Sequence, residues 1–408
     1  VLGKTWGNMK LFLGLNFVIL IETAIITLTS GAANIDFRAY LIYFFLISIP
    51  TLVYIMGLSF ALMLIVKNQA ITFVILLGYI CISTFYIQEK YYYLFDYMGY
   101  ALPLMKSSII GFSNLYEIYT LRFIYLFLGI GFIALTIRLY GRLPNSKQKA
   151  NIWSVVAGTF IIAGLFCAYT HVTQFNVKSE NRLAYLALNN AYSNSPEIQV
   201  DSFDIKLKQL PDQVKASVTI CGHTEVKADS FVFSLNPALK LESITDANND
   251  QLNYERNKQI IIVKLKHALE NDAPVKWTFN YSGTIDQTIC YLDIEKEELE
   301  KTVSMDFVNL DKQYAFIENN YLLLTPESYW YPRSGTGYST EGTNWMRSVF
   351  SQFRTEIETL PNLYAITQGD SISFIDNKFI YKTDEPITNL SVTIGDYQKR
   401  TTKIDNID

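Results

Sequence analysis

The chain has 408 residues, a formal net charge of −4 and a hydrophobic fraction of 50%, and its length exceeds what one hydrophobic core usually supports. The charge is divided unevenly, because residues 1–171 carry a net +6 and residues 172–408 a net −10. Neither part has the clustered positive charge that nucleic-acid binding requires, so the composition excludes a nucleic-acid partner and predicts two regions in different surroundings.

Five apolar segments fill the first region, and each is close to or longer than the roughly 20 residues that a helix needs to cross a bilayer. We therefore predict a membrane-embedded α-helical bundle of five spans over residues 1–171. The first segment is followed by further spans and lacks a small-residue cleavage site, which excludes a signal peptide. Since the chain begins with Val1 rather than Met, we expect an internal piece of a longer protein. The predicted spans are 11–30, 40–66, 70–88, 119–140 and 151–171.

Basic side chains indicate on which side of the membrane each loop lies, because Lys and Arg accumulate in cytoplasmic loops. Alternate loops of the first region carry Lys or Arg without any acidic residue, whereas the loops between them are mixed. This pattern predicts a multi-pass protein of the cytoplasmic membrane, with its N-terminus inside and everything after residue 171 extracytoplasmic. The basic residues of the first kind of loop are Lys4, Lys10, Lys67, Arg138, Arg142, Lys147 and Lys149.

Two polar side chains lie inside the first predicted span. A carboxylate such as that of Glu22 is costly in a bilayer and faces a bundle interior or water. It therefore indicates either a transport or proton-linked role or a structural acid at a helix contact. Asn16, six positions earlier, could form a hydrogen bond to another helix.

The order of the spans resembles the last part of an ABC-type exporter permease. In this resemblance "GKTWGNMK" is a cytoplasmic coupling segment, 91–117 is an outer re-entrant hairpin, and 151–171 is an additional span. The resemblance implies transport, pairing with a second permease copy, and a cytoplasmic ATPase that contacts Lys4, Trp6 and Lys10. The ATPase would be a separate chain, because this sequence has no G-x-x-x-x-G-K-[ST] phosphate-binding motif.

The composition becomes polar after the last span. Residues 172–195 predict a partly helical connector that ends at a Ser-Pro pair. Residues 196–408 then contain many short runs rich in β-branched and aromatic residues, such as "QIIIVKL" and "VKWTFNYSG", bounded by Asn, Asp, Gly and Pro. This pattern predicts a mainly-β region, a twisted sandwich or saddle. Asp376 and Asn377 separate two such runs and predict a tight hairpin turn.

The motifs of this second region resemble those of the N-terminal β-domain of gluzincin aminopeptidases of the membrane-alanyl type. The resemblance covers residues 200–397 and includes a Tyr-Ser-Gly turn at 281–283, Tyr331-Pro332 in "YLLLTPESYWYPRSG", and "IGDY" at 394–397. It implies a peptide substrate whose free amine is held by a Gln or Glu shortly before the aromatic-Pro pair. Glu327 is the acid in that place, and with Tyr331 it forms the candidate substrate-binding pair. The alternative is a solvated loop acid beside packed aromatic rings.

The same family binds a catalytic zinc ion through H-E-x-x-H on a helix. The histidines of this chain, His171, His223 and His267, do not have this spacing, so we expect neither a metal site nor a catalytic residue within the chain. In the family the metal helix follows the β-domain, which would place it beyond Asp408. Zinc is therefore expected only if a downstream catalytic domain exists, and whether the whole protein is an enzyme stays open.

Two of the four cysteines, Cys221 and Cys290, lie in the second region. An oxidising outer compartment would permit a disulfide between them, and two free thiols are the alternative.

Three functions are compatible with these features. The first is a transport permease subunit fused to an aminopeptidase-like extracytoplasmic module. The second is a membrane-anchored zinc aminopeptidase whose spans are tethers. The third is a non-catalytic extracytoplasmic binding or sensor protein. We take the first as the working hypothesis, because its predicted span order and sidedness agree with the resemblance.

Overall fold

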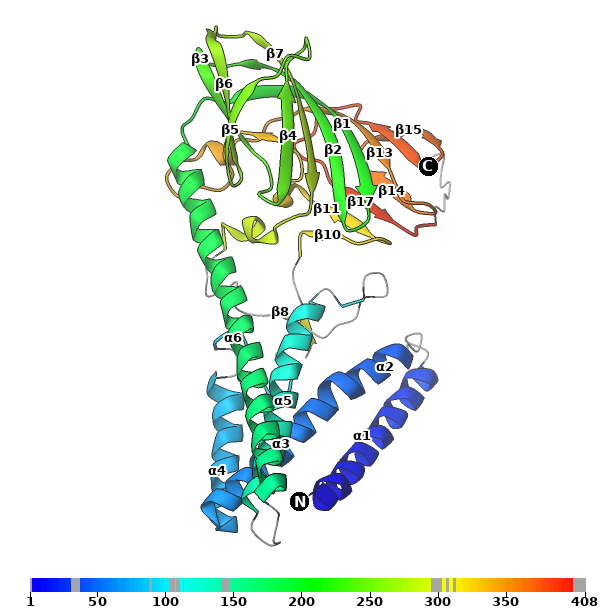
Figure 1. The fold of residues 1–408 in the computed structure, drawn as a ribbon. Coiled ribbons are helices and arrows are strands. Elements are labelled where there is room, and N and C mark those ends of the chain that lie inside the picture. The colour runs from blue at the N-terminus through cyan, green and yellow to red at the C-terminus, as the bar shows by residue number, and fades with distance from the viewer. Residues whose placement is uncertain are drawn as a thin grey trace. The chain divides into compact units, whose positions relative to one another are not determined.

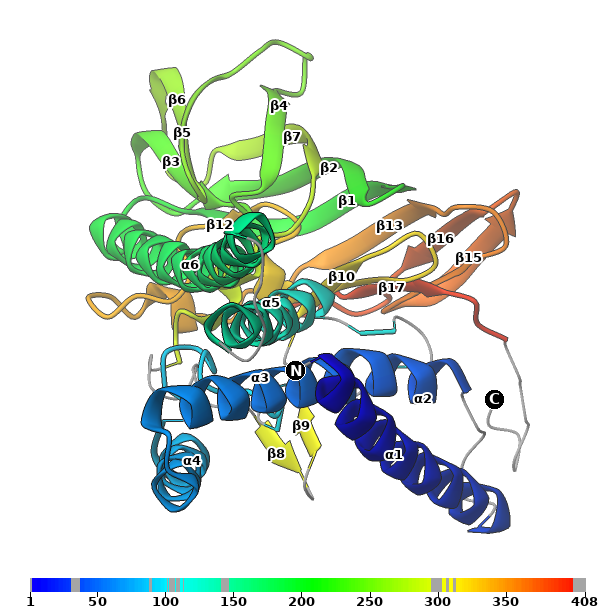
Figure 2. The same cartoon turned by 60° about the horizontal axis from the view of Figure 1, so that its bottom comes forward.

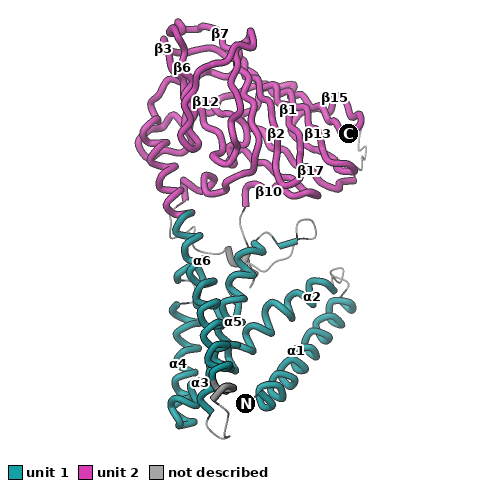
Figure 3. Tube along the Cα trace, viewed as in Figure 1, with its two compact units in different colours: residues 1–107, 111–177, 300–311 teal, residues 108–110, 178–299, 312–408 magenta. Residues whose placement is uncertain are grey.

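The computed structural model describes residues 2–30, 37–87, 90–100, 102, 107, 111–112, 114–140, 147–294, 303–305, 308–310 and 313–398. Figure 3 shows that the chain divides into two compact units. The first unit comprises Val1–Ser107, Gly111–Val177 and Glu300–Asp311, and the second comprises Ser108–Ile110, Lys178–Leu299 and Lys312–Asp408.

The first unit is helical (Figure 1). Among the residues that the structure describes, five helices are long and apolar enough to cross a membrane, which confirms the prediction of five apolar helices before a mainly-β region. The second of these five is continuous through a π-helical segment, η1. The helical elements are α1 (Leu2–Ser30), α2 (Phe37–Tyr43), η1 (Phe44–Ser48), α3 (Ile49–Val66), α4 (Gln69–Ile82), η2 (Ser83–Ile87), α5 (Leu115–Leu139) and α6 (Lys147–Tyr192).

Helix α6 extends well past the end of the last predicted span. The residues predicted as a connector, 172–195, are helical up to Tyr192. No Gly or Pro occurs between Gly164 and Pro196, so nothing in the local sequence breaks the helix before that proline. The change from apolar to polar composition at residue 171 therefore does not coincide with a change of secondary structure.

Helices α3 and α5 approach each other closely at two glycines. A β-carbon added to Gly129 would lie 2.6 Å from the backbone nitrogen of Tyr54, and one added to Gly57 would overlap the carbonyl of Gly129. Small residues at such a contact let two helix backbones touch, which is the usual way that helices pack within a bilayer.

One buried arginine, Arg122 of α5, joins α5 to the irregular part of the neighbouring helix. Pro50 has no N–H, so the carbonyl of Leu46, four residues earlier, cannot accept the usual helical hydrogen bond. Arg122 Nε donates to this carbonyl at 3.0 Å, and its other nitrogens donate to Thr51 Oγ1 at 2.6 Å and to the carbonyl of Tyr97 at 3.1 Å. The side chain is 1% exposed, and its Nε donor replaces the one helical bond, to the Leu46 carbonyl, that Pro50 cannot make.

The second unit is mainly β, as predicted. Its largest sheet has seven strands in the order β15-β16-β13-β1-β2-β7-β4, and two four-stranded sheets have the orders β10-β11-β17-β14 and β12-β3-β6-β5. A pair of short strands, β8 (Val303–Met305) and β9 (Val308–Leu310), belongs to the first unit. The strands of the second unit are β1 (Ile198–Leu210), β2 (Gln213–Thr224), β3 (Ala228–Ser234), β4 (Leu239–Thr245), β5 (Asn253–Asn257), β6 (Ile260–Leu269), β7 (Pro274–Gly283), β10 (Ala315–Ile317), β11 (Leu322–Leu324), β12 (Arg333–Ser334), β13 (Gln352–Glu358), β14 (Tyr364–Thr367), β15 (Asp370–Ile375), β16 (Lys378–Lys382) and β17 (Val392–Gly395).

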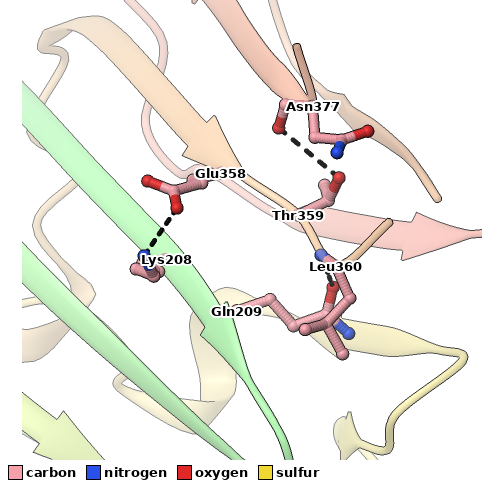
Figure 4. A network of polar contacts seen from close by, with 6 residues as sticks. All are labelled: Lys208, Gln209, Glu358, Thr359, Leu360 and Asn377. Carbon is pink, nitrogen blue, oxygen red and sulfur yellow. Dashed lines mark hydrogen bonds and ion pairs between the residues drawn. The ribbon is translucent and has the colours of Figure 1, made fainter. Parts of the chain in front are cut away.

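The largest sheet is mixed, because β1 pairs with β13 in parallel while its other neighbour, β2, is antiparallel. Figure 4 shows the polar contacts where this parallel pair ends. The backbone N–H of Leu360 donates to Gln209 Oε1 at 3.2 Å, and Thr359 Oγ1 donates to the carbonyl of Asn377 at 3.4 Å. These side chains satisfy backbone groups that leave the ladder, as buried backbone groups require.

Strand β15 is the last strand at one edge of the seven-stranded sheet, beside β16, and none of the described residues pairs with its other side (Figure 2). Its hairpin turn is the predicted pair Asp376 and Asn377, with φ of 48° and 62°, as a type I′ turn requires, so the turn prediction is confirmed. The edge strand itself exposes three large apolar side chains: Ile372 is 58%, Phe374 56% and Ile375 67% exposed.

Candidate functional site

The aromatic stretch 321–335 folds into the core of the second unit. After a 3-10 turn, η4 (Pro326–Ser328), Tyr329 takes a left-handed conformation and the chain turns inward. Trp330 and Tyr331 are 1% and 2% exposed. Trp330 Nε1 donates to the carbonyl of Leu390 at 3.2 Å, and the Trp330 carbonyl accepts from the hydroxyl of Tyr281 at 2.8 Å. Trp330 and Tyr331 therefore anchor the connection between β11 and β12 in the core, whereas Glu327 of the same connection is exposed.

A cavity of about 340 Å³ lies beside this stretch, and both predicted substrate-binding residues, Glu327 and Tyr331, line it. Its volume is near the lower end of the range of about 300–1,000 Å³ for small-molecule pockets. More of the cavity wall is polar than apolar, and acidic groups outnumber basic ones. The charged lining residues are Glu197, Glu225, Asp293, Glu327, Arg333 and Arg347.

Arg347 and Glu225 neutralise each other at the rim of the cavity. Two guanidinium nitrogens of Arg347 donate to the two carboxylate oxygens of Glu225, at 2.7 and 2.5 Å. This fork-shaped contact is the strong form of an ion pair. It lowers the pKa of Glu225 and raises that of Arg347. The charges of Arg347 and Glu225 are thus balanced within this pair.

Glu197, the residue before β1, places a carboxylate in the cavity without a fixed partner. Among the residues that the structure describes, none forms a hydrogen bond with the Glu197 side chain. Burial raises its pKa, while the nearby Arg347 opposes this rise. The carboxylate lies against Gly335, whose φ is +77° and whose missing side chain leaves the space that the Glu197 oxygen fills. A cation entering the cavity would find this acid unpaired.

Glu327 precedes and Arg333 follows Tyr331 in the sequence, and all three residues line the cavity. Both charges influence the Tyr331 hydroxyl, because Glu327 raises and Arg333 lowers its pKa, which burial raises most. In the described part of the chain, neither Glu327 nor Arg333 forms an ion pair. The Arg333 guanidinium instead lies 5.6 Å from the ring centre of Tyr329, a cation–π distance. The cavity therefore holds separated charges of opposite sign.

Two further polar groups line the cavity. The Oδ1 atom of Asn389 is buried without a hydrogen-bond donor among the described residues, so it can accept a hydrogen bond from a ligand N–H. The thiol of Cys290 is buried, and burial together with Asp286 and Glu327 raises its pKa. The thiol stays protonated at neutral pH and is not an activated nucleophile.

The remaining predicted residues lie elsewhere. Lys4, Trp6 and Lys10 are exposed on the first turns of α1, which is continuous with the first predicted span, and Lys10 Nζ lies 5.4 Å from the Trp6 ring centre. Asn16 Oδ1 accepts a hydrogen bond at 3.2 Å from the hydroxyl of Ser48 in η1. Glu22 is exposed on α1.

The cysteines and histidines form no joint site. Cys221 on β2 and Cys290 in η3 (Gln287–Tyr291) are both free thiols, so the disulfide that the sequence allowed is not formed in the structure. Among the described residues, no group of three or more His, Cys, Asp or Glu side chains is placed to hold a metal ion. The residues of the cavity therefore do not fit zinc, and no chemical step is assigned to a metal.

Glu197, Glu225 and Arg347 were not predicted to be members of one cavity. Arg333 directly follows the Tyr331-Pro332 pair and lines the same cavity. Glu197 precedes the first predicted strand, and only the pairing of distant strands brings it to the same cavity.

Comparison with known proteins finds similar solved structures but no matching protein family. No family model and no curated protein matches the chain. Among solved structures, an M1 zinc metallopeptidase from Deinococcus radiodurans is 13% identical with a TM-score of 0.36, and its mutant bound to a Tyr-Ser-Ala substrate is 12% identical with a TM-score of 0.35. Each match covers 49% of this chain and 42% of that chain. Native yeast LTA4 hydrolase is 16% identical with a TM-score of 0.33, over 48% of this chain and 29% of that chain.

Proposed function

We propose that the chain is the membrane-anchored, substrate-recognising part of an aminopeptidase-like protein, and that the cavity of its second unit binds the free amino group of a peptide. The observation that carries the proposal is the cavity itself, which is lined by Glu327 and Tyr331 together with further acidic residues. Once Glu225 and Arg347 are paired, Glu197, Asp293 and Glu327 face a single Arg333. An excess of negative charge in a concave site attracts cations such as an ammonium group.

The proposal also assigns roles to the apolar helices and to a downstream domain. The five apolar helices would anchor the chain in the cytoplasmic membrane, and the basic loops of the first region favour an extracytoplasmic second unit. Catalytic zinc would be supplied by a downstream domain, as the resemblance to gluzincin aminopeptidases implies. Without such a domain, the same cavity would serve a binding or sensor protein.

The amino-group proposal predicts the effect of neutralising Glu327. We expect Glu327→Gln to weaken binding of a free alanine tripeptide by about 10- to 100-fold, because an ionic hydrogen bond contributes about 1.5–3 kcal/mol. The measurement is calorimetric titration of the full chain in detergent. N-acetylation of the tripeptide should weaken binding to the unsubstituted chain by a similar factor.

The matched control is Glu341→Gln, which removes an exposed acid that does not line the cavity. This variant should bind the tripeptide as the unsubstituted chain does. Equal affinity of the free and N-acetylated tripeptides for the unsubstituted chain would overturn the amino-group proposal.

A transport function is a second proposal, and it depends on the start of α1. Lys4, Trp6 and Lys10 are exposed there, with Lys10 beside the Trp6 ring, and could contact a cytoplasmic ATPase of a paired permease. Removal of both lysine charges, by Lys4→Gln with Lys10→Gln, should abolish co-purification of an ATP-hydrolysing chain from native membranes. Undiminished co-purification of ATPase activity would contradict this proposal.

A further inference from the structure

Arg333 differs from the other arginine of the cavity because none of the acidic groups that the structure describes forms an ion pair with it. Arg347 has both carboxylate oxygens of Glu225 as acceptors. For Arg333, the described residues provide an aromatic contact with Tyr329 but no hydrogen bond or ion pair. The side chain is half-buried, so its donors are partly withdrawn from water without protein acceptors. A guanidinium with free donors is suited to a planar, two-oxygen anion such as a carboxylate.

The position of Arg333 in the fold fixes it relative to the acidic part of the cavity. It begins β12, which pairs with β3 through Arg333 opposite Ser234 and Ser334 opposite Phe233. The neighbouring Ser334 hydroxyl accepts a hydrogen bond from the backbone N–H of Ile198 at 2.7 Å. The strand that carries Arg333 is thereby tied directly to the start of β1, next to Glu197.

Tyr331, which lies between Glu327 and Arg333 in the sequence, is fixed in the core of the second unit. Tyr331 is buried between Phe203 and Trp330, with ring-centre distances of 5.4 and 4.9 Å, and its hydroxyl accepts a hydrogen bond at 3.4 Å from the backbone N–H of Leu390. These contacts hold Tyr331, and with it the chain that leads to Arg333, in one place. Arg333 and Glu327 both line the cavity and, among the described residues, form no ion pair with each other, so the cavity offers one group for an anion and another for a cation.

We propose that Arg333 binds a carboxylate of the same ligand whose amino group the acidic side chains bind, so that the cavity selects short zwitterionic peptides. This inference rests on the proposed function and adds a second recognition point to it. The carboxylate would be the C-terminus of a peptide of two or three residues or an acidic side chain near the amino end. The volume of about 340 Å³ favours a short ligand over an extended chain.

The test uses four alanine tripeptides with the full chain in detergent at neutral pH and low salt, measured by calorimetric titration. One tripeptide has free ends, one is N-acetylated, one is C-amidated, and one is C-amidated with aspartate in the second position. For the unsubstituted chain, amidation should weaken binding about 10- to 100-fold, the range of one charge-assisted contact. For Arg333→Met, the free and amidated peptides should bind equally.

Two variants separate recognition from folding. Arg333→Lys keeps the charge and should recover part of the difference between free and amidated peptides. Arg354→Met removes an exposed arginine of β13 that pairs with Asp204 and does not line the cavity, so the difference should stay intact. Thermal unfolding midpoints of all variants verify that the second unit is folded.

The outcomes separate this inference from the proposed function. Weakening by N-acetylation but not by amidation would uphold the amino-group site and overturn the role of Arg333. Weakening by amidation that persists unchanged in Arg333→Met would also overturn it. Recovery of affinity by the aspartate-containing amide, lost again in Arg333→Met, would support the inference and assign the carboxylate to a side chain.

Discussion

Replacement of Arg122 by methionine should lower the free energy of unfolding of the chain by about 3–5 kcal/mol, the cost of leaving buried polar groups without their charged partner. Methionine fills much of the same space but donates no hydrogen bond. The carbonyls of Leu46 and Tyr97 would then be buried without the donors that Arg122 provides. Within an apolar helical bundle, water does not replace such donors. The measurement is a denaturant titration of the chain in detergent, followed by circular dichroism of the helices.

Arg138→Met is the matched control for this experiment. Arg138 lies in the last turn of the same helix, where its Nε donates to the hydroxyl of Ser154 in an exposed contact. Its loss should change the free energy of unfolding by less than about 1 kcal/mol. An Arg122→Met variant as stable as Arg138→Met would show that the contacts at η1 do not hold the bundle together.

Trp330→Ala should destabilise the second unit by about 3–5 kcal/mol, the usual cost of truncating a buried tryptophan. Trp330 is 1% exposed, so its removal leaves a cavity that the surrounding strands close only in part. It also leaves the Leu390 carbonyl without the Nε1 donor. Hydrogen exchange measured by mass spectrometry should show faster exchange of β17, which begins two residues after Leu390.

Trp345→Ala provides the comparison. Trp345 is half-buried, and its Nε1 donates to the carbonyl of Ser339 at 3.1 Å. Because this side chain already contacts water, its truncation should cost much less and should leave β17 exchange unchanged. Equal acceleration of β17 exchange in the two variants would mean that Trp330 stabilises β17 no more than the half-buried Trp345 does.

The sequence predicts those features that depend on neighbouring residues. The apolar helices follow from composition, and the turn at Asp376 and Asn377 follows from two residues that tolerate positive φ. Residues 172–195 were predicted to be a partly helical connector, and the structure continues α6 through them to Tyr192, because no Gly or Pro interrupts the helix. Arg122 lies in a predicted span and was not predicted to have a role, although an arginine inside a span is itself an indication of one.

Only some of the residues that line the cavity can be predicted from the sequence. The order of motifs identifies Glu327 and Tyr331, because both belong to one short stretch. Glu197 reaches the same cavity only through the contact of β12 with the start of β1, and Arg347 only through its pairing with Glu225. Such contacts join residues more than a hundred positions apart, and a single sequence has no local pattern that encodes them.

The sheet edge at β15 has a practical consequence for anyone who purifies this protein. An unpaired strand offers a row of backbone donors and acceptors on which a strand of another molecule can add. A bulge between Ser371 and Ser373 interrupts this row once, but the apolar side chains of Phe374 and Ile375 remain exposed beyond it. Detergent that covers the apolar helices does not occupy the backbone hydrogen-bonding groups of a strand edge. Self-association can therefore begin there even in well-solubilised samples. Lysine in place of Ile375, the most exposed of the three apolar residues on this strand, is the smallest change that would protect the preparation.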